Sequence, residues 1–177
     1  MRASHIRFIR QQGFAGESFP DSFYTALMLQ PRVVGCMAVV GIVLQSAWFF
    51  LMLSAVLLWS ALVPAWNPFD AIYNHVVAYR RGLPPLGAAL APRRFAAGEA
   101  GTVALAIAAA LATGATTTAW IVEAVLIGGV ISVALADFCL GAYTYDLLRR
   151  LWPGASAATT ASWQTQFSTR IGQPRRE

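Results

Sequence analysis

Lysine is absent from this 177-residue chain, and charged side chains of any kind are scarce. Only 12% of the residues are charged and 57% are hydrophobic, whereas a soluble domain carries about 25% charged residues. The basic residues are all arginines, and they flank two long apolar stretches. This pattern predicts an integral membrane protein. We expect the arginines to act as topology signals and to contact lipid headgroups, and we expect no nucleic acid partner.

Cysteine and histidine are equally sparse, with two of each. Two cysteines give no disulfide framework, and the chain has no G-x-S-x-G, H-E-x-x-H, P-loop or C-x-x-C motif. We therefore predict no catalytic set, no metal site and no cofactor, although a bound lipid, quinone or pigment stays open. The first thirty residues contain no apolar signal-peptide core, so we expect the N-terminus to be retained.

The two apolar stretches must be divided into membrane spans. Residues 33–64 would form one helix of roughly 46 Å or a thin hairpin, against a hydrocarbon core of about 30 Å. The second stretch breaks at 114–118, where Gly114 suits a helix end and the threonines supply N-cap hydroxyls. Three spans would place the central arginines outside, but four put all arginines on one side, as the positive-inside rule requires. The predicted spans are 33–45, 47–63, 97–113 and 118–139.

The predicted fold is therefore all-α, an integral membrane four-helix bundle made of two helical hairpins. Residues 1–30 form an N-terminal cytoplasmic or interfacial segment, 31–148 the transmembrane domain, and 149–177 a basic C-terminal tail. We expect a multi-pass protein of the bacterial inner membrane with both termini in the cytoplasm.

A cytoplasmic interfacial helix is predicted at 68–81, between the hairpins. Asn67 is a suitable N-cap, Pro68 suits the first helical position and Gly82 can end the helix. His75 lies on this helix. It is either an interfacial surface residue or a ligand for a metal or pigment, but no usual metal partner stands three or four residues away.

The motifs "NPFDAIYNHVVAYRRGLPPL", "APRRFAAG" and "FCLGAYTY" resemble an uncharacterised family of small bacterial membrane proteins, domain-of-unknown-function family 4395. The resemblance covers roughly residues 31–148. It implies a membrane protein without an established reaction. It also implies a thiol connection, because some members look to end in F-C-x-G-C and the family occurs alongside thioredoxin-type and sulfur-transfer proteins. Here Ala142 stands at the position of the second cysteine.

The four-span arrangement places Cys36 and Cys139 near the inner ends of the first and fourth helices. At a shared depth they form a possible thiol pair, which as a disulfide would need roughly 5.5 Å between the Cα atoms. The two are either small apolar core residues or a cytoplasm-facing dithiol that exchanges with a soluble partner or a quinone.

Acidic residues are predicted only near helix ends. Glu123 follows Trp120 by three residues, so it either reaches outward to water or forms a possible intramembrane acid that binds an ion or proton. Asp137 stands at the end of the fourth helix, where the helix dipole disfavours a negative charge. We expect it to pair with an arginine, among Arg93, Arg94 and Arg149.

Small residues recur at a spacing of four in the third and fourth predicted spans, which lets helices approach closely. The helix-packing candidates are Ala104, Ala108 and Ala112, with Gly101 nearby, and then Gly128, Ser132 and Ala136. They serve either packing within this bundle or docking of a partner subunit.

Three functions fit these features. The preferred one is a non-catalytic accessory or scaffold subunit of a larger bacterial membrane complex of respiratory or photosynthetic type, with the bilayer and other membrane subunits as partners. The second is a membrane thiol-redox protein that partners thioredoxin-like or sulfur-transfer proteins. The third is a small transporter.

Overall fold

The computed structural model describes residues 2–15, 19–83 and 85–151, and within this part every regular element is a helix. The all-α class is therefore confirmed for the described residues. The α-helices are α1 (Ala3–Gln11), α2 (Asp21–Leu44), α3 (Ala47–Leu62), α4 (Pro68–Ile72), α5 (Tyr79–Arg81), α6 (Ala91–Ala112), α7 (Thr116–Ala136) and α8 (Leu140–Leu151). A 3₁₀ turn, Pro64–Trp66, and a π-helical segment, Tyr73–Ala78, complete them.

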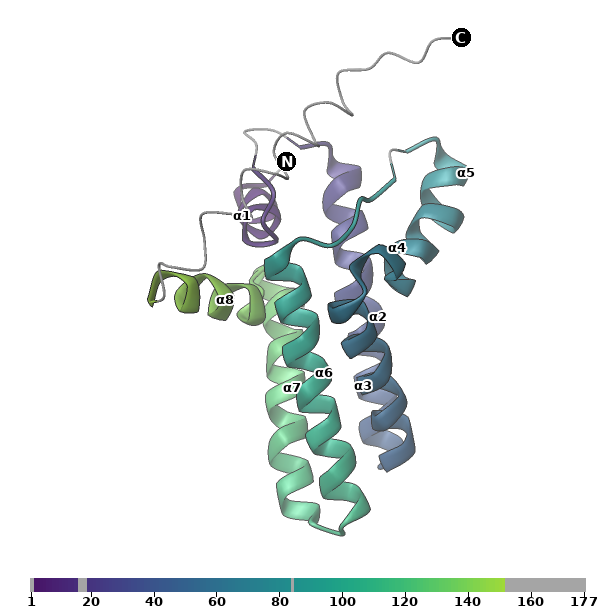
Figure 1. The fold of residues 1–177 in the computed structure, drawn as a ribbon, viewed down its shortest axis with the longest axis vertical. Coiled ribbons are helices and arrows are strands. Elements are labelled where there is room, and N and C mark those ends of the chain that lie inside the picture. The colour runs from purple at the N-terminus through teal and green to yellow at the C-terminus, as the bar shows by residue number, and fades with distance from the viewer. Residues whose placement is uncertain (1, 16–18, 84, 152–177) are drawn as a thin grey trace.

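Three helices, α2, α6 and α7, are long and apolar enough to cross a membrane. This confirms the membrane character of the chain at the level of its helices. The apolar helix α3 has 16 residues, which make about 24 Å. Together α2, α3, α6 and α7 run along the long axis of the molecule, with α3 against α6 and α7 against both α6 and α2 (Figure 1).

The turn between α2 and α3 falls at Gln45 and Ser46, as predicted. Without a glycine, Gln45 itself takes a left-handed conformation, with φ of 46°. Its side-chain amide donates to the carbonyl of Ile42 at 2.8 Å, so it satisfies one of the free carbonyls at the end of α2. Ser46 Oγ accepts a hydrogen bond from the Phe49 amide at 3.3 Å and caps α3.

The turn between α6 and α7 also lies where the sequence predicts it. Gly114 has a φ of 73°, a conformation that glycine adopts at little cost. The expected threonine caps are wrong, however, because the residue before α7 is Ala115 and no side chain caps this helix. Thr116 is the first residue of α7 and its Oγ1 donates to the Gly114 carbonyl.

Helix α2 begins at Asp21, twelve residues before the predicted span, and Pro31 lies inside it. The predicted boundary follows the start of the apolar stretch at residue 33. A proline removes one backbone donor, but a transmembrane helix surrounded by other helices tolerates it. Consequently much of the predicted N-terminal segment 1–30 is helical, in α1 and in the first turns of α2.

The helix predicted at 68–81 is present as α4, the π-helical segment and α5 in direct succession. Asn67 caps it by accepting a hydrogen bond from the Phe69 amide at 3.0 Å, and Gly82 ends it with a φ of 61°. Both end signals of the sequence are therefore confirmed.

A buried ion pair joins this segment to the long helices. The two terminal guanidinium nitrogens of Arg93, on α6, donate to the Asp70 carboxylate, Nη1 at 3.0 Å and Nη2 at 2.5 Å. Arg93 also donates to Gln30 Oε1 of α2 at 3.0 Å. Burial raises the pKa of Asp70, although Arg93 opposes the shift. Three elements that lie far apart in the sequence thus meet at one polar contact.

The main contact in the molecule is between α3 and α6. Gly101 allows it, because a Cβ there would come within 3.0 Å of Leu58 Cγ. Ser54 Oγ donates to the Gly101 carbonyl at 2.8 Å across the same contact. Small residues on α6 therefore bring two backbones close together, as they do between membrane helices.

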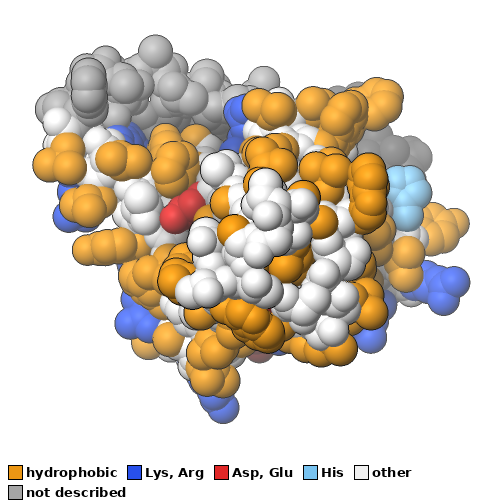
Figure 2. All heavy atoms as spheres, turned by 90° about the horizontal axis from the view of Figure 1, so that it is seen from below, with side chains coloured by type: hydrophobic (Ala, Val, Ile, Leu, Met, Phe, Trp, Pro, Cys, Tyr) orange, Lys and Arg blue, Asp and Glu red, His pale blue; other side chains and the backbone are white. Residues whose placement is uncertain are grey.

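The two ends of the molecule differ in charge. Seen from the end that carries the turns, the centre of the surface is apolar or uncharged, and basic side chains lie at its margin (Figure 2). The helices α1, α5 and α8 lie toward the opposite end (Figure 1). Of the predicted basic tail 149–177, only residues 149–151 fall within the described part.

Candidate functional site at the α7–α8 junction

Helix α7 ends at Ala136, three residues before the predicted end of the fourth span. Asp137 takes a left-handed conformation with φ of 51° and stops the helix. Ser132 Oγ donates to the Phe138 carbonyl at 2.7 Å and holds the chain as it leaves α7. Helix α8 starts at Leu140 and runs across the axis of α7 (Figure 1).

Asp137 is held by α1 and α2. The Tyr24 hydroxyl of α2 donates to Asp137 Oδ1, and His5 Nε2 of α1 lies 3.9 Å from Oδ2. The rings of His5 and Tyr24 stack with their centroids 3.8 Å apart. Burial raises the pKa of the Asp137 carboxyl, but hydrogen bonds from Tyr24 and Ser4 and the nearby basic groups outweigh it, so the pKa lies below its usual value.

Arg93 and Arg94, two of the three arginines expected to pair with Asp137, have other partners. Arg93 binds Asp70 instead, and Arg94 Nε donates to the Ala61 carbonyl at 2.9 Å. Arg7 does reach this junction, and its guanidinium donates to the Ala136 carbonyl at 3.2 Å. A cation at the last carbonyls of α7 is where the helix dipole favours it.

Cys139 lies beneath α1 at the same junction. Its backbone amide donates to Gln11 Oε1 at 3.2 Å, and its side chain packs against the buried cluster that includes Phe8 and Ile9. Burial raises the pKa of the Cys139 thiol above its usual value. A reactive cysteine is typically exposed and has a lowered pKa, so these surroundings are those of a packed thiol.

The structure does not bring the two cysteines together. Both are free thiols, and Cys36 is exposed on α2. Tyr24 marks the level of Asp137 on α2, and Cys36 lies twelve residues further along that helix, or about 18 Å. The predicted shared depth depended on a helix that starts at residue 33, whereas α2 starts at Asp21.

Glu123 is buried between the two hairpins, with a relative exposure of 1%. Gln45 Nε2 donates to both of its carboxyl oxygens at 3.1 Å. The side chain therefore does not reach outward to water, which corrects one of the two expectations. It links the end of α2 to α7 near the turns.

His75 is exposed on the π-helical segment, and its Nδ1 lies 3.1 Å from the Ala71 carbonyl. No group of three or more metal-ligating side chains occurs among the described residues. His75 is thus a surface residue of this segment, and its role as a ligand stays a prediction.

The two rows of small residues differ in their surroundings. On α6, Ala104 and Ala108 are buried and Ala112 is exposed beside the turn. On α7, Gly128 and Ala136 are exposed and Ser132 is partly buried. A Cβ added at Gly128 would have no neighbouring atom of the chain within 4 Å. Ala104 and Ala108 thus pack within the chain, whereas Gly128 and Ala136 face outward.

Sequence reasoning missed the residues of α1 and α2 that build the junction: His5, Arg7, Gln11 and Tyr24. The sequence signal for α1 is that, as a helix, "SHIRFIRQ" separates apolar side chains on one face from arginines on the other. That pattern shows an amphipathic helix but not the surface that it covers.

A family model for a domain of unknown function, DUF4395, matches residues 26–150. No curated protein matches the chain, and no solved structure does. The matched range begins within α2 and ends in α8, so it includes Asp137 and Cys139 but not α1. The chain belongs to the DUF4395 family, as the resemblance of its motifs predicted.

Proposed function

We propose that the chain is a non-catalytic subunit of a larger bacterial membrane complex and that it binds a neighbouring transmembrane helix through α7. The observation that carries this proposal is the open row on α7. Gly128 and Gly129 have no chain atom within 4 Å of an added Cβ, whereas Gly101 of α6 is closed by Leu58. Outward small residues let a partner backbone approach closely.

The proposal includes a four-span topology in the inner membrane with both termini in the cytoplasm. Two arrangements support it: the turns gather at one end, and the arginine-bearing helices α1, α5 and α8 lie toward the other (Figure 1). Both follow the positive-inside rule. Helix α3 is shorter than the hydrocarbon core is thick, and local thinning of the bilayer accommodates such a helix.

The thiol-redox alternative has less support from the geometry. It needs a reactive sulfur or a pair of sulfurs, but Cys139 is packed beneath α1 and Cys36 lies at another level. The proposed host is a complex of respiratory or photosynthetic type.

The test is gentle solubilisation from the native membrane, followed by native mass spectrometry of the wild type and of Gly128→Leu. We expect the wild type to carry a stoichiometric membrane partner. We expect the variant to lose it while keeping its own thermal stability, because space is open at Gly128. Ala106→Leu, a similar enlargement on the exposed side of α6, is the control and should retain the partner. A wild type that runs alone would refute the proposal.

A further inference from the structure

We propose that the groove between α1 and α8 binds the headgroup of a phospholipid that carries a primary amine beside its phosphate, as in phosphatidylethanolamine. The inference depends on the membrane placement given above, and it adds a ligand site of defined chemistry. It is carried by the charges that line one pocket and by the position of the two helices that form it.

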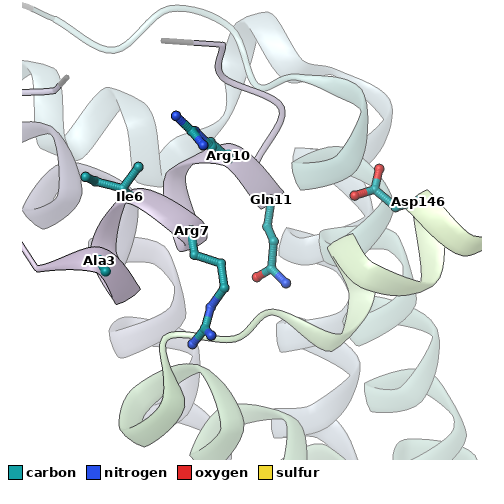
Figure 3. A pocket seen from close by; sticks show the side chains of 6 residues that line it. All are labelled: Ala3, Ile6, Arg7, Arg10, Gln11 and Asp146. Atoms are coloured by element: carbon teal, nitrogen blue, oxygen red, sulfur yellow. The ribbon is translucent and has the colours of Figure 1, made fainter. Parts of the chain in front are cut away.

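The pocket has a volume of about 510 Å³. Its lining residues are Ala3, Ile6, Arg7, Arg10 and Gln11 of α1 and Asp146 of α8. Arg7 and Gln11 extend from α1 toward the chain that joins α7 to α8, and Asp146 stands on α8 on the other side (Figure 3). The site thus presents cations and an amide on one wall and a carboxylate on the other.

These groups match the two charges of the headgroup. Guanidinium groups bind phosphate oxygens well, often with two parallel hydrogen bonds. Gln11 uses its oxygen for the Cys139 amide, so its side-chain nitrogen is left to donate to the ligand. Asp146 forms no ion pair within the described part of the chain, and its carboxylate suits the ammonium group. A headgroup with a phosphate alone would leave this carboxylate unmatched and near a like charge.

The position of α8 selects a lipid as the source of this headgroup. The apolar side chains of α8 that face outward are Leu140, Tyr143, Leu147, Leu148 and Leu151, between 46% and 72% exposed. Its last turn carries Arg149 and Arg150. A helix of this kind lies in the membrane interface with its apolar face among the acyl chains. The pocket beside it therefore lies at the level of the headgroups, with Ile6 on its wall.

The experiment is a titration of the delipidated full chain in detergent, followed by native mass spectrometry. The probes are dioleoyl phosphatidylethanolamine, the matching phosphatidylglycerol and water-soluble glycerophosphoethanolamine. We expect the wild type to prefer phosphatidylethanolamine over phosphatidylglycerol by about fivefold, the effect of one partly exposed charge pair. Weak binding of the soluble headgroup would show that the lipid, and not a free phosphodiester, is the ligand.

Asp146→Asn should abolish the preference between the two lipids, because it removes the group that meets the amine and leaves the arginines in place. Arg80→Gln, on α5 outside the pocket, is the control and should retain the preference. Equal binding of both lipids to the wild type would overturn the proposal. So would a preference that survives in Asp146→Asn, or a soluble headgroup that binds as tightly as the lipid.

Discussion

Arg93 is a buried cation at the point where α2, α4 and α6 meet, with a relative exposure of 6%. Its partners, Asp70 and Gln30, are buried as well. A buried ion pair is weak evidence of net stability, because both charges must leave water. The pair is better evidence that α4 docks on α6 in one specific arrangement, because both terminal nitrogens of Arg93 must reach the Asp70 carboxylate at once.

We therefore predict that Arg93→Met destabilises the protein by about 3–5 kcal/mol, because it leaves the Asp70 carboxylate buried without a cation. The double variant Asp70→Leu/Arg93→Met should recover most of this loss, with about 1–2 kcal/mol remaining because Gln30 Oε1 loses its donor. Thermal or denaturant unfolding in one detergent would measure both.

Arg80→Met, on the exposed end of α5, should change the stability by less than about 0.5 kcal/mol. If the double variant were as unstable as Arg93→Met alone, the loss would come from packing around the arginine and not from the uncompensated charge.

At the scale of elements, α8 is held against α6 by a close backbone contact at Gly141. A Cβ added at Gly141 would lie 2.7 Å from Ala96 Cα. Glycine is required here by the approach of α6 and not by flexibility, and this contact sets how α8 leaves α7.

We predict that Gly141→Val costs about 2–3 kcal/mol, because neither backbone can move away without separating α8 from α6. The variant should also become sensitive to limited proteolysis within Leu140–Leu151, since α8 would no longer be docked. Gly87→Val is the matched control, because an added Cβ there has no neighbour within 4 Å. Proteolysis of α8 at the wild-type rate would contradict this account of Gly141.

At the scale of the whole molecule, local chemistry and long-range contacts were predictable to different degrees. The helix at 68–81 and the turn between α6 and α7 follow from short signals such as Asn67-Pro68, Gly82 and Gly114. The turn between α2 and α3 has no such signal and is predicted from the length of the apolar stretch and the positive-inside rule. The start of α2 does not follow from the sequence in this way, because the prediction begins at the apolar stretch from residue 33, whereas α2 starts at Asp21 and contains Pro31. A proline within a helix is tolerated where other helices pack around it.

The candidate site was the least predictable feature for a related reason. The Asp137 carboxylate meets Tyr24 and His5, which lie more than a hundred residues earlier in the chain. No periodicity or end signal specifies such a contact. It depends on how α1 packs on the end of α7, and α1 lies outside the range that the family model matches.

The membrane topology can be tested by labelling introduced cysteines in a chain whose own cysteines are replaced (Cys36→Ala/Cys139→Ala). A cysteine introduced as Thr116→Cys, at the turn between α6 and α7, should react with a membrane-impermeant maleimide on intact spheroplasts. A cysteine introduced as Tyr79→Cys should react only after lysis, because the four-span arrangement places α5 in the cytoplasm. Tyr79 is 85% exposed, so burial within the chain would not explain its protection. Labelling of Tyr79→Cys on intact spheroplasts, with Thr116→Cys protected until lysis, would show that the central arginines lie outside, as in a three-span arrangement.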